Sequence, residues 1–240
     1  MTPLQQDILL TLKEFDDFCQ EHNVVYFLMW GTLLGAIREK GFIPWDDDID
    51  IAMDLKNFKK LKNLASEGKL PSHLAFEDSL FIKGCRVPKI RNKKTNIVDL
   101  TGGYGVFIDI FPFQRYSEIE KSILTIASYG LKYRDFRGHI KNYFLRKLFT
   151  FTTIPPYLLF IATRAIMSKK TETSDGPYIG KSVNTNPEIF FDFKNFSSTT
   201  KKTFEGFDFP VPIGFASILE RAYGDWRTPI DCNNVHYDIQ

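Results

Sequence analysis

The sequence is poor in the features that mark secreted or zinc-binding proteins. Its 240 residues include only three cysteines, Cys19, Cys85 and Cys232. Their spacing fits neither a disulfide framework nor a CxxC metal site, so we expect a reducing compartment. The first ten residues lack a basic stretch followed by an apolar one, so no secretory signal is expected. Internal repeats and low-complexity tracts are also missing.

The overall composition is that of a globular protein. Hydrophobic residues make up 43% of the chain and charged residues 25%, which argues against wholesale disorder and against a polytopic membrane protein. Aromatic residues reach 15%, with 23 phenylalanines, so the chain can bury a sizeable core. The length predicts one large domain or two small ones.

The net charge of +2 is unevenly distributed. Residues 131–170 carry nine Lys or Arg and one acid, so that segment has a charge of +8 and the remainder −6. Its uncharged part, 148–163, is too short and too broken by two prolines to span a bilayer. Eight aromatic residues in the segment favour docking on an anionic membrane, while a pair of core helices with solvated basic faces is the alternative. The acidic remainder argues against a nucleic-acid binder.

Hydrophobic periodicity predicts alternating helices and strands. Helices are expected over 4–22, 55–66, 117–131, 136–149 and 157–167, with a helical turn at 33–38. Strands are expected over 24–29, 48–53, 80–90, 95–100 and 106–111, the last ending at Pro112. Turn or loop composition marks 102–105 and 171–187.

A cluster of acids at residues 46–50 is the strongest signal of chemistry. Four carboxylates within five residues repel one another and usually need a compensating charge. On a strand, Asp48 and Asp50 share a face with their Cα atoms about 7 Å apart, so both can bind one hard cation. An acidic surface loop or an isolated calcium site is the alternative.

Two further features add to this cluster. Asp109 lies inside the apolar run 106–111, where a carboxylate is expensive to bury unless it is paired or bound to metal. Gly31 and Thr32 form a Gly-polar turn after the first predicted strand. Three carboxylates on neighbouring strands beside such a turn predict a phosphate and metal site. The arrangement resembles the nucleotidyltransferase fold of the DNA polymerase beta type.

Longer blocks resemble one family within that fold. They are YFLMWGTLLGAIREKGFIPWDDDIDIAM at 26–53, KIRN at 89–92 followed by Thr95, GVFIDIFP at 105–112, FEG at 204–206 and YGD at 223–225. In this order they are similar to the LicD/fukutin-related family, over residues 4 to about 236. The resemblance implies an α+β fold with a small mixed or antiparallel sheet flanked by helices and a helical, loop-rich C-terminal part. We expect a catalytic core at 1–115, a basic aromatic helical segment at 116–170 and a C-terminal part at 171–240 that packs on the core.

The resemblance also implies an activity. Family members transfer a phospho-substituent, such as phosphocholine or ribitol phosphate, from a CDP-linked donor to a glycan hydroxyl and release CMP. We therefore expect a transferase that uses Mg²⁺ or Mn²⁺, with CDP-choline as the first candidate donor. The acceptor would be a cell-surface glycan or its lipid-linked precursor, in the synthesis of lipopolysaccharide, capsule or teichoic acid. Such a protein would be cytoplasmic, with residues 131–170 touching the inner face of the membrane.

The resemblance assigns roles to the acids. Asp48 and Asp50 are expected to be metal ligands. Asp46 either completes the metal shell or binds its water, and Asp47 is expected to be a cap or a surface salt bridge. Asp109 is either the third ligand or the general base that accepts the proton of the acceptor hydroxyl. A buried ion pair with an arginine is the alternative for Asp109.

Polar and basic residues are candidates for binding the donor. Gly31 and Thr32 would present a backbone N–H and a hydroxyl to the diphosphate. Arg38 could bind a phosphate with both arms of its guanidinium, or could pair with Glu39 or Asp47 at the helix end.

Lys89 and Arg91 alternate on a predicted strand and so share a face. They could neutralise the leaving nucleotide or could form a solvated basic edge. Glu205 and Asp225, beside turn glycines, could cap, bind the acceptor or contact the cation of choline. The four histidines show no ligand spacing and are expected to be structural.

Two other functions remain open from the sequence. One is a nucleotidyltransferase that adds NMP from an NTP to a small molecule or protein and releases pyrophosphate. The other is a binding module for nucleic acid or lipid, in which the acids form a calcium site.

Overall fold

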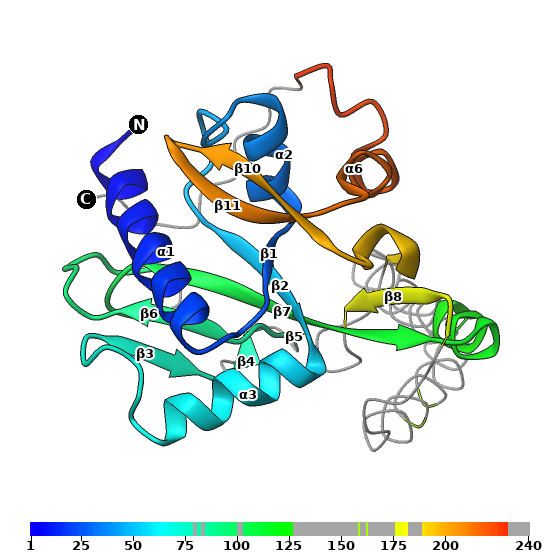
Figure 1. Cartoon of the computed structure of the whole chain (residues 1–240), viewed down its shortest axis with the longest axis horizontal. Helices are drawn as coiled ribbons and strands as arrows, with labels where there is room; N and C mark the ends of the chain where they lie inside the picture. Colours follow the sequence, from blue (N-terminus) through cyan, green and yellow to red (C-terminus); the bar gives the residue numbers. More distant parts are fainter. Residues whose placement is uncertain are drawn as a thin grey trace, which may run out of the picture. The chain divides into compact units, whose positions relative to one another are not determined.

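The computed structural model describes residues 1–78, 81–82, 85–99, 103–126, 158, 162, 176–181 and 189–229. They form a mixed sheet with helices against it (Figure 1), which confirms the α+β class. The helices are α1 (Pro3–Glu21), α2 (Trp30–Arg38), α3 (Leu55–Ser66), η2 (Phe193–Phe196) and α6 (Phe215–Tyr223). The strands are β1 (Phe27–Leu28), β2 (Asp50–Asp54), β3 (Leu74–Glu77), β4 (Phe81–Ile82), β5 (Cys85–Arg86), β6 (Lys89–Asn92), β7 (Phe107–Tyr116), β8 (Tyr178–Lys181), β9 (Phe190–Asp192), β10 (Thr199–Phe204) and β11 (Phe207–Pro212).

The chain divides into two compact units. The first comprises Met1–Phe113 and Lys194–Gln240, and the second comprises Gln114–Phe193. The predicted end of the catalytic core at residue 115 lies close to the first division, and the residues from 194 onward group with that core. The domain boundaries proposed after residues 115 and 170 both stay predictions.

The sheet of the first unit places distant parts of the sequence next to each other. Its strands follow the order β1-β2-β7-β6-β3. The central pair, β2 and β7, is parallel, and the other neighbours are antiparallel. The acidic stretch before β2 and the acid inside β7 therefore lie on adjacent strands, although more than fifty residues separate them in the chain.

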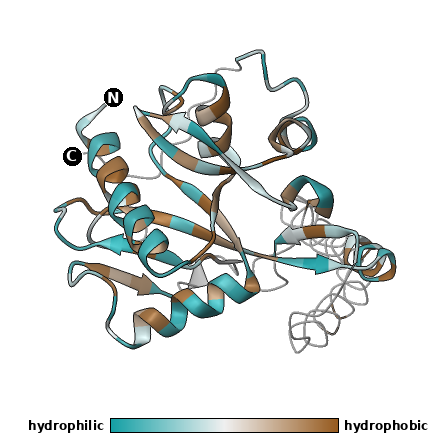
Figure 2. Cartoon of the chain, viewed as in Figure 1, coloured by the Kyte–Doolittle hydropathy of each residue, from teal (hydrophilic) through white to brown (hydrophobic). Residues whose placement is uncertain are grey.

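The two long helices near the N-terminus follow from local signals. At the start of α1, Thr2 and Gln5 form a reciprocal capping box, and a proline occupies the first turn. The Asp54 side chain caps α3 by accepting from the Asn57 N–H at 2.7 Å. Figure 2 shows apolar and polar bands along both helices, as expected when one side packs on the sheet. The helices predicted over 4–22 and 55–66 are thus confirmed.

Several strand predictions need correction. The strand expected over 80–90 is replaced by β4 and β5, which pair with each other, and by the start of β6. The strand expected over 95–100 reduces to one isolated bridge between Val98 and Tyr104. The strand expected over 24–29 shrinks to the two residues of β1. Apolar runs alone do not define strand ends, because pairing partners decide where a ladder begins and stops.

Pro112 does not end β7, contrary to the prediction. The strand continues to Tyr116, and Pro112 lies opposite Met53 of β2. On the other side of β7, pairing with β6 runs only from Phe107 to Asp109. β6 does not reach Pro112 on that side of β7, so the missing N–H of the proline costs no hydrogen bond to β6.

The second unit has its own small core. Tyr116, Leu124 and Phe190 pack together with Tyr178 against them, and the Tyr116 hydroxyl donates to the Lys181 carbonyl at 2.7 Å. β8 pairs with β7 and β9, so the loop predicted over 171–187 contains a strand. The polar composition of this stretch gave no strand signal, because β8 depends on pairing with its neighbours rather than on local preference.

The remaining predicted helices fall largely outside the described residues. Residues 118–126 are helical, within the helix expected over 117–131. The helices expected over 136–149 and 157–167, and the basic segment 131–170, lie outside the described residues except for 158 and 162. Within the described parts of the chain, no helix is long and apolar enough to cross a bilayer.

Candidate active site

Three carboxylates from two separate stretches of chain meet at the centre of the sheet. Asp50 in β2 lies opposite Asp109 in β7, and the Asp109 N–H donates to the Ile49 carbonyl at 2.8 Å. Among the described residues, Asp48, Asp50 and Asp109 form a group of acids that can offer one ligand atom each, with these atoms within 4.8 Å of one another. Carboxylate oxygens at this spacing suit a hard divalent cation such as Mg²⁺ or Mn²⁺. The donor set therefore fits the expected metal.

One basic side chain joins this cluster. Lys89 in β6 lies opposite Asp109, on the side away from β2, and the two side chains form an ion pair. The Lys89 ammonium also lies 3.5 Å from the centroid of the Phe107 ring. Both side chains of the pair are largely buried, so the interaction is poorly screened by solvent. The cluster thus combines three negative charges with one positive charge.

The backbone of the acidic segment is held by neighbouring elements. The buried Gln5 side chain of α1 donates to the Asp46 carbonyl at 2.8 Å. The Thr32 hydroxyl accepts the Asp50 N–H at 2.8 Å, and the Met29 N–H donates to the Asp50 carbonyl at 3.0 Å. These contacts hold the backbone of Asp46 and Asp50 in place before any ligand binds, which reduces the cost of organising the site.

The predicted Gly-Thr turn is the first turn of α2. A Cβ added at Gly31 would lie 2.8 Å from an Asp46 carboxylate oxygen, so a larger residue would have to push that side chain aside. Thr32 is 2% exposed and its hydroxyl is occupied by the Asp50 N–H. The structure therefore places Gly31 beside Asp46 and Thr32 beneath Asp50, while Asp46 lies outside the group of three acids. Binding of the diphosphate at this turn stays a prediction.

Arg38 lies at the far end of α2. Its Nε donates to Glu39 Oε1 at 2.6 Å, and another of its nitrogens donates to the Trp226 carbonyl at 3.2 Å. The structure thus shows the arginine paired with Glu39, which was one of the two arrangements considered for it. Asp47, expected to be a cap or a surface salt bridge, is buried at 8% exposure.

Lys89 and Arg91 share a face, as predicted, since both cations lie over the Phe107 ring. The Arg91 guanidinium, however, is held by Glu77 at 2.9 Å and by Asp99 at 2.8 Å. Burial lowers the pKa of Arg91, but its hydrogen bonds to the two acids outweigh this and raise the pKa above its ordinary value. The structure therefore brings Lys89 to the carboxylate cluster and gives Arg91 a place in the scaffold.

Comparison with known proteins agrees with this geometry. The model of the LicD/FKTN/FKRP nucleotidyltransferase domain matches residues 23–152, which is more than half of the chain and includes all three acids of the cluster. The chain belongs to the LicD/FKTN/FKRP family.

Individual relatives of this LicD-family chain differ in sequence identity and in the share of the chain that aligns with them. The lipopolysaccharide cholinephosphotransferase LicD of Haemophilus influenzae is 27% identical over 255 aligned positions, which cover 98% of this chain and 95% of that protein. An uncharacterised protein of Rickettsia prowazekii is 43% identical over 42 residues, covering 18% of this chain and 16% of that protein. An uncharacterised protein of Caenorhabditis elegans is 51% identical over 47 residues, which cover 20% of this chain and 12% of that protein.

Two residues help to organise the site of this LicD-family chain, but the sequence did not reveal their roles. Gln5 carries no signal beyond its place in a predicted helix. Glu205 belongs to the FEG block, and its carboxylate accepts the Phe42 N–H at 3.0 Å while its own N–H donates to the Lys40 carbonyl at 2.8 Å. These two hydrogen bonds join the β10–β11 turn to the loop that leads into the acids. We call this pair of contacts, from Glu205 to Lys40 and Phe42, the clasp. Gly41 lies within this clasp, since a Cβ there would clash with the Glu205 carboxylate.

This clasp gives a testable prediction about stability. Glu205→Ala should lower the free energy of unfolding by about 1–3 kcal/mol, because it leaves the Phe42 N–H without its acceptor. Gly41→Ala should cost a similar amount, since the new methyl displaces the same carboxylate. The double variant should be about as stable as either single variant, which denaturant unfolding would measure. Additive losses would contradict a shared mechanism.

The YGD block also has a structural place. Gly224, with φ of 69°, ends α6, and its N–H donates to the Glu220 carbonyl at 2.9 Å. Asp225 is exposed, and a hydrogen bond from Thr228 is the main cause that lowers its pKa. The block therefore acts as a helix end in this structure.

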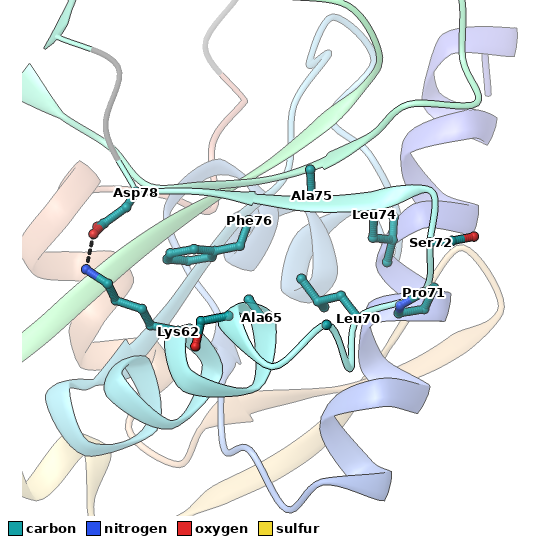
Figure 3. Close-up of a pocket in the computed structure, with 11 residues that line it drawn as sticks. Lys62, Ala65, Leu70, Pro71, Ser72, Leu74, Ala75, Phe76 and Asp78 are labelled. Atoms are coloured by element: carbon teal, nitrogen blue, oxygen red, sulfur yellow. Dashed lines mark hydrogen bonds and ion pairs between the residues drawn. The ribbon is translucent and has the colours of Figure 1, made fainter.

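A pocket separate from the cluster lies between α3 and β3 (Figure 3). Its volume is about 460 Å³, and Leu70, Leu74 and Phe76 line it. Lys62 and Asp78, which also line the pocket, form an ion pair there. None of the predicted site residues lines it, so the carboxylate cluster is the better candidate for the chemistry.

Proposed function

We propose that this protein is a metal-dependent transferase that moves phosphocholine from CDP-choline to a hydroxyl of a cell-surface glycan or its lipid-linked precursor and releases CMP. The observation that carries the proposal is the convergence of Asp48, Asp50 and Asp109 across β2 and β7. Membership of the LicD/FKTN/FKRP family supports transferase chemistry. The near full-length similarity to a lipopolysaccharide cholinephosphotransferase supports the choice of donor and of a glycan acceptor.

The three carboxylates would hold the metal in this proposal. A divalent ion bound by Asp48, Asp50 and Asp109 would supply positive charge to the donor diphosphate and polarise the reacting phosphoryl group. Asp46 lies next to the first turn of α2 and could bind a water of the metal shell. Lys89 neutralises part of the carboxylate charge and can contact the phosphates as they arrive.

The reaction proposed is a single displacement at the distal phosphorus of the donor. The acceptor hydroxyl oxygen forms the new bond to that phosphorus, and its proton passes to a carboxylate of the cluster acting as general base, with Asp109 as the candidate, and from there to solvent. The bond from the same phosphorus to the bridging oxygen breaks, and CMP leaves with its electron pair. The residues of the chain position the diphosphate and offset the charge that develops on the transferring group.

The cellular setting is part of the same proposal. We place the reaction in the cytoplasm, with the basic aromatic segment 131–170 against the inner face of the membrane. An acceptor linked to lipid would lie at that surface, and basic and aromatic residues suit contact with anionic lipid. Liposome flotation with and without anionic lipid tests this proposal, and the protein should float only with the anionic vesicles. Equal flotation with neutral and anionic vesicles, or none with either, would contradict it.

Product analysis tests the reaction itself. The protein, Mg²⁺, CDP-choline and lipopolysaccharide should yield CMP, and chelation of the metal should abolish product until Mg²⁺ or Mn²⁺ is restored. Parallel reactions with CDP-ribitol, CDP-glycerol and CDP-ethanolamine should yield less. Pyrophosphate released from CTP would instead favour the alternative nucleotidyltransferase, which adds NMP to its acceptor.

A further inference from the structure

The face of β7 that carries Asp109 also carries aromatic rings on both sides of it. Phe107, Asp109 and Phe111 alternate along the strand and therefore point to the same face. Asp109 lies opposite Asp50, and Phe111 lies opposite Ala52, two positions further along β2. The Trp30 ring meets Phe111 edge to face, with centroids 6.1 Å apart and an interplanar angle of 80°. The carboxylate cluster is thus bordered by a tryptophan–phenylalanine pair.

The backbone holds Trp30 in an unusual conformation. Its φ of 50° lies in the left-handed region, which bulky residues rarely adopt. The residues on either side are fixed: the Met29 N–H donates to the Asp50 carbonyl, and Gly31 packs against Asp46. Non-glycine residues in this region are found at ligand sites, where the surrounding structure imposes the conformation. The fold therefore positions the partly exposed Trp30 side chain beside the acids.

The other ring on this face already contacts a cation. The Lys89 ammonium lies 3.5 Å from the centroid of Phe107 while it pairs with Asp109. A cation over an aromatic face next to a carboxylate is therefore an arrangement that this surface stabilises. On the opposite side of Asp109, Phe111 and Trp30 offer the same two components, aromatic rings and a nearby carboxylate, to a ligand.

We propose that Trp30, packed on Phe111, binds the quaternary ammonium group of the donor and so selects choline over neutral polyols. This inference rests on the proposed function, because it assigns the part of the site that recognises the transferred group. A quaternary ammonium has no N–H to donate, so aromatic faces and carboxylate charge are the contacts that recognise it. Asp109 and Phe111 lie roughly 7 Å apart along the strand. The short two-carbon chain between phosphorus and nitrogen suits this scale.

A neutral analogue of the donor isolates the cation from the rest of the ligand. The probe is the tert-butyl analogue of CDP-choline, in which carbon replaces the ammonium nitrogen. Calorimetric titration with Mg²⁺ should show that the full-length protein binds CDP-choline about tenfold more tightly than this analogue. Trp30→Leu should bind the two ligands alike, and Trp30→Phe should keep most of the preference. Binding of CDP should be unchanged in both variants.

The outcomes separate this inference from the proposed function. If the unmodified protein binds both ligands equally, or if Trp30→Leu keeps the tenfold preference, the role of Trp30 is overturned while CMP release from CDP-choline still stands. If the protein binds CDP-ribitol or CDP-glycerol and not CDP-choline, the proposed donor fails first. Phe111→Leu is the second variant, with the same loss of preference expected. Equal binding of the two ligands by the unmodified protein would overturn the inference even if both variants misfold.

Discussion

Asp50→Asn should lower turnover by about a thousandfold or more, because a divalent ion contributes several kcal/mol of charge stabilisation to such transition states. The substitution keeps the shape of the side chain and removes the charge. The fold should persist, since Asp50 is held through its backbone: its N–H by the Thr32 hydroxyl and its carbonyl by the Met29 N–H. The loss should therefore appear in chemistry and metal binding rather than in stability.

The measurement combines CMP release from CDP-choline with the rise in melting temperature that Mn²⁺ produces. In Asp50→Asn both should be lost, while the melting temperature without metal stays close to that of the unmodified protein. Asp47→Asn is the matched control, since Asp47 belongs to the same acidic segment but not to the group of three acids. It should affect turnover far less. Near-normal turnover in Asp50→Asn would remove Asp50 from the metal site, and equal losses in both variants would point to the charge of the whole segment.

The candidate site could be predicted from the sequence because its acids stand out against their surroundings. Alternation identified Asp48 and Asp50 as a pair on one face, and an apolar run marked Asp109 as a carboxylate that needs a partner. Their meeting depends on the parallel pairing of β2 and β7, which no local pattern encodes. Neighbouring strands were nevertheless expected, from the cost of burying a lone carboxylate and from the nearby Gly-polar turn, and the family resemblance then added the roles. The structure brings the three side chains together.

Other features could not be predicted because they depend on contacts between distant segments. Gln5 reaches Asp46, and Glu205 reaches Phe42, across long stretches of chain. The hairpin of β10 and β11 and the helix α6 carry much of the C-terminal part of the first unit, yet neither was assigned from periodicity. The Gly31–Thr32 turn was recognised, but the contact of the Thr32 hydroxyl with the Asp50 N–H depends on the tertiary fold.

Arg91→Leu should lower the free energy of unfolding by about 3–5 kcal/mol, since removing one partner of a buried ion pair leaves the other charge uncompensated. The Arg91 and Asp99 side chains are 3% and 2% exposed, and Arg91 also binds Glu77 and the Gly105 carbonyl. For a protein of this size, that loss corresponds to a fall in melting temperature of about 10 °C. Arg91→Lys should lose less, because it keeps the charge but lacks the planar group that reaches three acceptors.

The matched control is an exposed pair in the same unit. Lys62 and Asp78 are each about half exposed, so Lys62→Gln should change stability by no more than about 1 kcal/mol. The test also separates the two roles considered for Arg91. If Arg91 is a scaffold residue, its replacement should lower the melting temperature and leave the dissociation constant of CDP-choline unchanged in the folded protein. If Arg91 instead neutralises the nucleotide, its replacement should weaken binding of CDP-choline and leave the melting temperature unchanged. That result would return Arg91 to the binding site.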